Sequence, residues 1–318
     1  MLQRIALGAV GIAALLVTMG AMAASKMADR MERLRAEKLE PRFEKLKPVS
    51  LPKTPPKPGE WLAEFAELGQ SVAEYRAGKP ERPTPERRTI YLQPIGEFAG
   101  ARAKILSATA DYTERFFGLP VRTLETLPLS EIPPTARRRN PHPGGGQEQI
   151  LAPYLIEQVL FARKPRDAIA ILGLTNVDLY PGPSWNYAFG QAAPDLGVGV
   201  WSLYRNGDPE ESAAAFRLCL KRAIATATHE LGHLFGVMHC VAWECQMNGV
   251  NHQEEADSRP LDLCPACLQK VIWFGGADPE KRYRRLAEFA RQQGLTTETS
   301  RFEKKAALCV GSPRTRAP

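Results

Sequence analysis

Apolar and polar positions along residues 89–204 form short runs that predict strands and helices in turn. Apolar runs of strand length occupy residues 90–95, 121–124, 168–174, 186–191 and 198–204. Residues 101–117 and 147–162 instead repeat their apolar positions every three or four residues, which is typical of amphipathic helices. The run at 168–174 has no polar side chain and is bounded by loop residues, which favours a central strand. This order predicts an α+β fold with an α/β-like alternation of strands and helices.

The best-marked helix in the sequence covers residues 208–235. Asp208 suits the N-cap, and Gly236 suits the left-handed residue that ends a helix. Its apolar stripe consists of Phe216, Leu220, Ile224, Ala227, Leu231 and Leu234. At about 100° per residue, His229 and His233 fall on roughly the opposite face. We therefore expect one face to pack on the core while the other presents two histidines to a cleft.

The first residues carry the pattern of an export signal. Arg4 precedes an uncharged run over residues 5–24 that is rich in Ala, Gly, Leu and Val, and the triplet at 21–23 has the small-x-small form that signal peptidase prefers. We expect residues 1–23 to be a signal peptide, removed from a secreted or periplasmic protein. The run is also long enough to cross a bilayer, which takes about 20 residues. A retained anchor, with membrane association through the N-terminus, is therefore the alternative.

The next segment, residues 24–88, is charged and rich in proline, above all over 48–58. Closely spaced prolines favour a stiff, extended chain, whereas the apolar spacing over 61–75 predicts a helix. We expect the whole segment to be a spacer with one or two helices and no catalytic residue. The main domain is then expected to begin at Thr89, and residues 291–318 are expected to form a C-terminal tail.

The strongest chemical signal is an extended histidine motif near the end of the predicted long helix. It reads His229-Glu230-Leu231-Gly232-His233-Leu234-Phe235-Gly236-Val237-Met238-His239. Histidines four positions apart on a helix lie one above the other, so both can bind one zinc ion. Gly236 lets the chain turn sharply and bring back His239 as a third ligand. Glu230 points to another side, where it can hold a water molecule and accept its proton.

The histidine motif therefore predicts a catalytic zinc bound by His229, His233 and His239, with Glu230 as the general base. A zinc site of this kind keeps one position for water, whose pKa the metal lowers towards about 7. A lone His-Glu-x-x-His sequence occurs by chance in many chains, but the extended form is far more specific.

Four cysteines follow the third histidine directly. Four residues separate Cys240 from Cys245, and two separate Cys264 from Cys267. Two close pairs are the usual spacing of a structural zinc site with four thiolate ligands. We therefore expect a second zinc ion, with two local disulfides as the alternative that an exported protein would permit.

The net charge and the composition of the chain exclude few classes of function. A net charge of +7 is a mild excess, and a hydrophobic fraction of 44% is ordinary for a globular protein. The one tight basic cluster, at residues 137–139, has no interleaved aromatic residues, so we expect no nucleic-acid partner.

The extended histidine motif with its following cysteine resembles the metzincin metalloproteases, and specifically the archaemetzincins. That family continues into a four-cysteine zinc site with a methionine two residues after the second cysteine, and Met247 stands at this place. Residues 174–180, 189–192 and 263–267 also resemble the family, and the resemblance covers roughly 89–290. By resemblance, Met247 is the residue of the Met-turn, which forms a hydrophobic floor under the catalytic zinc.

The resemblance implies a metzincin-type catalytic domain with a twisted mixed sheet, a long active-site helix and a small C-terminal subdomain after Gly236. In that fold a peptide lies extended along the edge strand above the cleft. Our candidate for this strand is 198–204, with an ordinary sheet strand as the alternative.

Together these observations predict a zinc-dependent metallopeptidase with two zinc ions per chain and a peptide or protein substrate. The alternative is a noncatalytic zinc-binding scaffold with the same fold, because function belongs to the site rather than to the fold. Loss of Glu230 would be the sequence mark of such a scaffold, and Glu230 is present.

Overall fold

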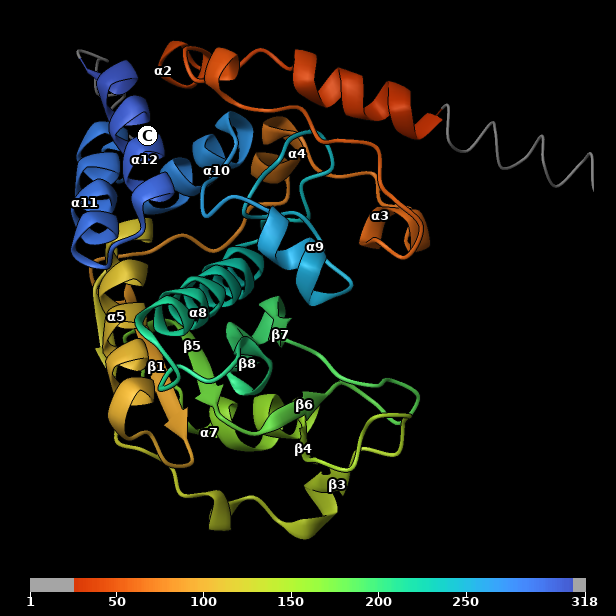
Figure 1. The fold of residues 1–318 in the computed structure, drawn as a ribbon. Helices are drawn as coiled ribbons and strands as arrows, with labels where there is room; N and C mark the ends of the chain where they lie inside the picture. Colours follow the sequence, from red (N-terminus) through yellow and green to blue (C-terminus); the bar gives the residue numbers. More distant parts are fainter. Residues whose placement is uncertain (1–25, 311–318) are drawn as a thin grey trace, which may run out of the picture.

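The structure, a computed structural model, describes residues 26–310 (Figure 1). The predicted export signal at residues 1–23 lies outside this part of the chain, so it stays a prediction. Within residues 26–310, no helix combines the length and the apolar character that crossing a membrane requires.

The main sheet has five strands in the order β2-β1-β5-β8-β7. These strands are β1 (Thr89–Ile95), β2 (Val121–Thr123), β5 (Ala168–Thr175), β7 (Gly190–Ala193) and β8 (Val198–Ser202). β1, β2, β5 and β8 are parallel, and β7 runs antiparallel to β8 at one edge. Every residue of β5 is buried, which confirms that the apolar run at 168–174 is a central strand. The result is a mixed sheet within an α/β arrangement.

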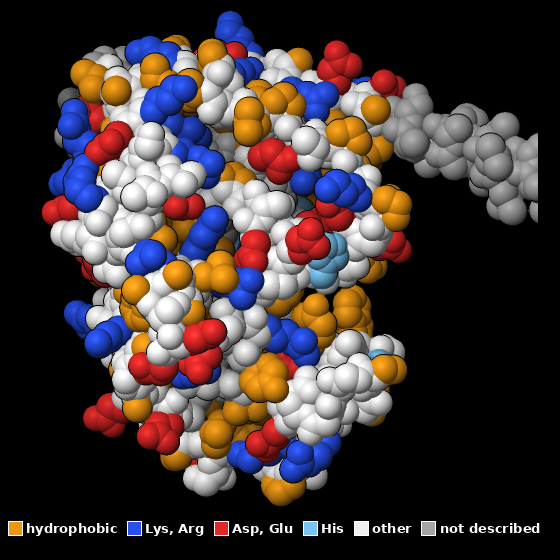
Figure 2. Space-filling view, in the orientation of Figure 1, with side chains coloured by type: hydrophobic (Ala, Val, Ile, Leu, Met, Phe, Trp, Pro, Cys, Tyr) orange, Lys and Arg blue, Asp and Glu red, His pale blue; other side chains and the backbone are white. Residues whose placement is uncertain are grey.

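A smaller sheet lies beside the main one and contains β3 (Arg137–Arg139), β4 (Glu148–Leu151) and β6 (Asp178–Tyr180). The basic cluster is tied into this sheet. Arg137 forms an ion pair with Glu148, and the Arg138 guanidinium lies 3.8 Å from the ring centroid of Tyr180. Basic and acidic side chains are interspersed over the face of the molecule shown in Figure 2.

Helices cover both faces of the main sheet because its strands are apolar on both sides. Leu172 and Leu174 of β5 belong to the core shared with α5 (Gly100–Phe117) and α8 (Ala213–Leu234). Ile171 belongs to the second core, beneath a continuous helical stretch. That stretch consists of α6 (Ala152–Tyr154), the π-helical η4 (Leu155–Leu160) and α7 (Phe161–Arg163). In Figure 1, α8 crosses the molecule between the sheet and the C-terminal helices.

Two helix predictions need correction at their starts. Residues 148–151 form β4 rather than helix, because this segment pairs with β3 and with β6. The long helix α8 begins later than its sequence suggests, since the hydroxyl of Ser212 accepts the hydrogen bond from the Ala215 N–H at 3.0 Å. Asp208 instead accepts from the Glu210 N–H, within the loop before the helix.

The N-terminal segment packs on the main sheet domain, whereas we expected a spacer with one or two helices. Residues 26–36 are helical, and short helices follow at α2 (Pro41–Glu44), α3 (Trp61–Glu64) and α4 (Val72–Ala77). Leu39, Phe43 and Leu46 are buried in the main core. The charged residues of this segment therefore alternate with apolar residues that face the domain.

After the histidine motif the chain forms α9 (Gln253–Ser258), α10 (Pro265–Gly275), α11 (Pro279–Gln292) and α12 (Thr296–Cys309). α11 and α12 lie side by side, and Phe302 of α12 is buried against the main core. Residues 291–309, which we expected to belong to a tail, are thus part of the folded body.

Candidate active site

The last two turns of α8 carry the first two histidines of the motif. The helix forms because its apolar stripe packs on the sheet while a serine caps its first turn. Spacing by four residues places the His229 and His233 rings one above the other, and their Nε2 atoms lie 3.0 Å apart. The helix then ends, and Gly236 has a φ of 80°, the left-handed conformation predicted for this position.

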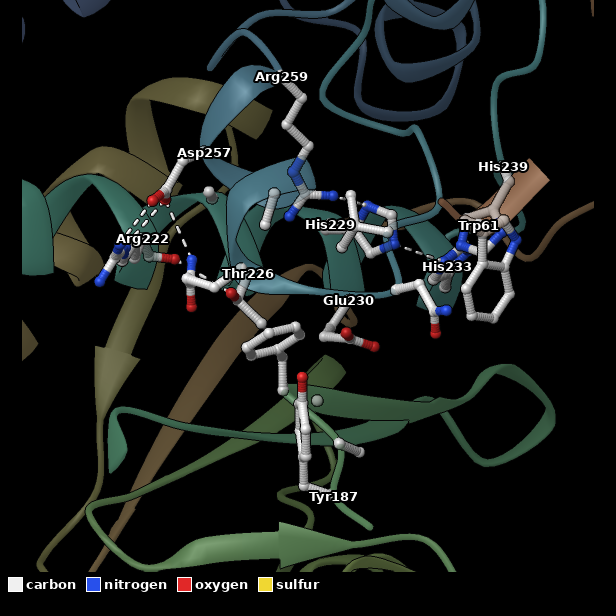
Figure 3. A pocket seen from close by; sticks show the side chains of 18 of the residues that line it. Trp61, Tyr187, Arg222, Thr226, His229, Glu230, His233, His239, Asp257 and Arg259 are labelled. Carbon is white, nitrogen blue, oxygen red and sulfur yellow. Dashed lines mark hydrogen bonds and ion pairs between the residues drawn. The ribbon is translucent and has the colours of Figure 1, made fainter. Parts of the chain in front are cut away.

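The turn at Gly236 brings His239 back to the other two rings. The ring centroid of His239 lies 5.2 Å from that of His229 and 4.8 Å from that of His233. One nitrogen from each of the three rings lies within 4.8 Å of the other two. The sequence-predicted triad is therefore brought together in space, at the position shown in Figure 3.

In each of the three rings, the partner of Nδ1, the outer nitrogen, shows that Nε2, the inner nitrogen, is free to bind a metal. Nδ1 of His229 lies 3.0 Å from the Gln246 carbonyl oxygen, and Nδ1 of His233 lies 2.8 Å from the Val237 carbonyl oxygen. Carbonyl oxygens only accept, so both Nδ1 atoms carry the proton and both Nε2 atoms keep a free lone pair. Nδ1 of His239 faces the Glu67 carboxylate at 2.9 Å, which gives this ring the same tautomer.

This arrangement fits zinc. When zinc binds nitrogen ligands tetrahedrally at about 2.0–2.1 Å, the nitrogens lie roughly 3.4 Å apart. This separation is close to the 3.0 Å between the Nε2 atoms of His229 and His233. Burial, followed by the neighbouring His239, lowers the pKa of His233 to about 4, and burial lowers the pKa of His229 well below its usual value. Both rings are therefore neutral near pH 7, the form in which imidazole binds a metal.

Glu230 lies beside the triad and lines the same cleft. Burial raises its pKa to about 8, and the positive charge of Arg259 opposes this rise. The backbone of Gly190 in β7 comes very close to it. A Cβ atom at Gly190 would lie 2.6 Å from Oε1 of Glu230, so the absence of a side chain there makes room for the carboxylate. The base candidate is thus held between α8 and the sheet edge.

Met247 packs directly under the turn of α8 that carries the histidines. It is buried, and a Cβ atom at Gly232 would lie 2.5 Å from its sulfur. The Met247 carbonyl accepts a hydrogen bond from the Cys240 N–H at 2.8 Å, which ties this turn to the residue after His239. An apolar side chain therefore closes the floor beneath the triad.

The four cysteines form a second cluster, fully buried and separate from the triad. Cys240, Cys245, Cys264 and Cys267 offer sulfur atoms that lie within 4.8 Å of one another, and all four are free thiols. Backbone N–H groups of Cys264 and Met247 donate to Cys245 Sγ at 3.2 and 3.5 Å. The sulfur atoms of Cys240 and Cys264 are 3.8 Å apart. Tetrahedral zinc–sulfur bonds of about 2.3 Å require an S···S distance of roughly 3.8 Å, so the cluster fits a structural zinc.

The triad opens into a cleft of about 400 Å³. Tyr187 and Phe189 line this cleft. Arg222, which forms an ion pair with Asp257, lies at the far end from His239 (Figure 3). β7 is the strand at the edge of the sheet next to this cleft, because β8 is hydrogen-bonded on both sides. Our expectation that 198–204 is the edge strand is therefore wrong.

Three residues at the site escaped the sequence analysis. Arg259 is buried, and its Nη1 donates to the Asn248 carbonyl at 3.0 Å while lying 3.1 Å from Nδ1 of His229. Trp61 lines the cleft, and Glu67 contacts His239, although both belong to the segment expected to be a spacer. No local motif marks any of them, since only tertiary packing brings them to the histidines.

Comparisons with known proteins cover the part of the chain that contains the histidine triad and the cysteine cluster. The profile of Peptidase family M54 matches residues 166–272, which include the histidine triad and all four clustered cysteines. Archaemetzincin-2 of Homo sapiens is 32% identical over 278 residues, which are 77% of this chain and 76% of that protein. Archaemetzincin-1 of Homo sapiens is 32% identical over 260 residues, 71% of this chain and 51% of that protein.

Among solved structures, the archaemetzincin of Methanopyrus kandleri is 26% identical and has a TM-score of 0.46, covering 59% of this chain and 96% of that one. The family profile and the identity to relatives that are covered over three quarters of their length are sufficient to assign the family. The chain belongs to the archaemetzincins, a family of zinc metallopeptidases.

Proposed function

We propose that His229, His233 and His239 hold a catalytic zinc ion at which the protein hydrolyses peptide bonds. The observation that carries this proposal is the convergence of three free imidazole nitrogens beside Glu230, at the base of an open cleft. Zinc bound there supplies a Lewis acid that polarises the scissile carbonyl and lowers the pKa of water towards about 7.

Glu230 acts in this proposal as the general base. Its carboxylate lies next to the triad without belonging to it, so it is free to accept the proton of the attacking water and pass it to the leaving amine. Burial already favours the protonated form, as the pKa near 8 indicates, which suits a group that must hold a proton between two steps. A dication nearby favours the carboxylate form at the start of the reaction.

The substrate in this proposal is an extended peptide that lies along β7, as the resemblance to the metzincins implies. Gly190, the first residue of this strand, lines the cleft next to Glu230, together with Ala188 and Phe189 just before it. An edge strand offers free backbone groups that can pair with an added strand, whatever its side chains. The aromatic rings of Tyr187 and Phe189 then face the side chains of the substrate.

A second zinc, in this proposal, binds the four cysteines and is purely structural. Four buried thiolates close the coordination sphere and leave no position for water. Because Cys240 follows His239 directly, this ion would also hold the third catalytic ligand in place.

The proposal is tested by comparing wild type, Glu230→Gln and His233→Ala for zinc content and for cleavage of a broad peptide library. Glu230→Gln keeps the size of the side chain but cannot accept a proton, so it should fold, retain zinc and lose activity by about 10²–10⁴-fold. His233→Ala should lose one zinc ion together with activity. Wild type loaded with zinc that cleaves nothing would contradict the proposal and favour the noncatalytic scaffold.

A further inference from the structure

A strap formed by residues 51–80 passes over the loop that carries His239. At its first end it pairs with the loop between the first two clustered cysteines. The Lys53 N–H donates to the Ala242 carbonyl at 3.0 Å, and the Glu244 N–H donates to the Leu51 carbonyl at 2.9 Å. The start of the strap is therefore attached next to the four-cysteine cluster.

The other end of the strap is attached to the turn that follows α8. The buried Tyr75 hydroxyl donates to the Phe235 carbonyl at 2.9 Å, and the Gln70 side chain donates to the Gly236 carbonyl at 3.2 Å. Both acceptors lie within four residues of His239 along the chain. The strap is thus fixed on both sides of the third histidine, through backbone carbonyls that the turn leaves without helical partners.

Between these ends the strap contacts the site itself. The backbone N–H of Trp61 donates to the Glu255 carboxylate at 3.1 Å. The Trp61 ring meets the His239 ring edge-on, with the ring centroids 5.2 Å apart. The Trp61 indole also packs against Gly249, because a Cβ atom added at Gly249 would lie 2.4 Å from Cδ1 of Trp61. Glu67 places both carboxylate oxygens 2.9 Å from Nδ1 of His239.

The three histidines differ in what holds them. His229 and His233 donate to the backbone carbonyls of Gln246 and Val237, whose positions follow from the helix and its adjoining loop. His239 lies on a loop and donates to a side chain of the strap. A carboxylate partner on the outer nitrogen fixes the tautomer and the ring orientation and makes the inner nitrogen more basic.

We infer that the strap is a working part of the active site, in which Glu67 orients His239 and strengthens zinc binding by the triad. This inference rests on the ligand set proposed above. Glu67 is a positioning residue, because it contacts His239 and does not itself bind the metal or the substrate. The catalytic unit therefore includes residues well before the start of the family profile at residue 166.

The test measures how tightly the triad holds zinc, with a competing chelator and zinc counting, in full-length wild type, Glu67→Ala and Glu67→Gln. Loss of an outer partner of a metal-binding histidine typically costs about 10–100-fold in metal affinity. We expect a loss of this size for Glu67→Ala and a smaller loss for Glu67→Gln, whose amide oxygen still accepts a hydrogen bond. The zinc of the four-cysteine cluster should be unaffected.

Glu64→Ala is the matched control, since Glu64 lies on the same strap and, within residues 26–310, its carboxylate accepts a hydrogen bond only from the Gly59 N–H, at 3.1 Å. Wild-type affinity in Glu67→Ala, or an equal loss in Glu64→Ala, would overturn the inference. If Glu67→Ala does not fold, an unchanged affinity in Glu67→Gln overturns it instead. A failure of the ligand set itself would look different, because His233→Ala would then bind as much zinc as wild type.

Discussion

A methyl group added to the sheet edge should displace Glu230, the proposed general base, without touching any of the proposed zinc ligands. In Gly190→Ala, the new Cβ atom would lie 2.6 Å from Oε1 of Glu230 and 2.8 Å from its Cδ and Cγ atoms. Ordinary contacts of this kind begin at 3.4 Å. The backbone of Gly190 is not in the left-handed region, so alanine itself brings no conformational strain.

The size of the effect follows from which atoms must move. The three clashing atoms belong to a flexible side chain that ends in the open cleft, so the fold can adapt by displacing the Glu230 carboxylate by about 0.8 Å or more. A misplacement of about 1 Å in a catalytic group can cost on the order of 10²-fold in rate. We therefore expect kcat/KM to fall about 10²-fold while zinc content and the unfolding temperature stay close to wild type.

The assay compares the kcat/KM of Gly190→Ala with that of Gly182→Ala, on a peptide that the wild type cleaves. Gly182 lies in the loop that leads to the cleft, and a Cβ atom there would meet only the Trp185 ring, at an ordinary 3.9 Å. This control should keep wild-type activity. Activity in Gly190→Ala within about threefold of wild type, alongside an inactive Glu230→Gln, would refute the reasoning that Glu230 works from the position seen here.

Two further predictions concern the metal clusters and pH. Cys264→Ser should remove one zinc ion and lower the unfolding temperature more than the control Cys309→Ser, because zinc bound by buried thiolates contributes folding energy; equal shifts in the two variants would count against a metal there. With zinc removed from the triad, burial raises the pKa of Glu230 from 4.5 to about 8, so between these pH values the folded protein keeps a proton that the unfolded chain has lost. The free energy of unfolding of wild type relative to Glu230→Gln should therefore fall progressively from about pH 5 to pH 8 and level off above pH 8. A difference that stays constant from pH 5 to pH 8 would show that the buried carboxyl has an ordinary pKa.

Most of the catalytic helix could be predicted because its signals are local. The apolar stripe of α8, the spacing of His229 and His233 and the glycine at its end all act within a few turns of one helix. The exact start could not be predicted, since Asp208 and Ser212 are both good caps, and loop geometry decides between them. The central strand β5 was predictable for a related reason, as a strand buried on both faces needs apolar residues at nearly every position.

Pairing between strands was harder to predict than the strands themselves. The order of β7 and β8 along the chain does not tell which of them pairs with β5, so the edge position of β7 follows only from the pairing seen in the structure. The extra strand β4 was hidden because its residues, 148–151, continue the apolar pattern of the helix that follows. Both errors concern long-range pairing, which no local pattern records.

The N-terminal segment shows a different limit. Its prolines and charges do match an extended chain, and residues 51–60 contain no helix. Whether such a chain floats free or lies against a domain depends on partners far away in sequence, such as Glu255 for the Trp61 N–H. An isolated tryptophan and a buried tyrosine within a charged stretch were the available hints, because large aromatic side chains gain most from burial.

His239 is the point where the separate parts of the molecule depend on one another. Two of the proposed zinc ligands come from a helix, but the third lies on a loop whose position depends on three contacts of different origin. Gly236 sets its direction, Cys240 ties the next residue to the four-cysteine cluster, and Glu67 holds the outer face of the ring. A change in any of these contacts reaches the triad through this one ligand. Zinc affinity is therefore expected to respond to changes in the strap and the cysteine cluster, while the positions of His229 and His233, fixed by α8, remain unchanged.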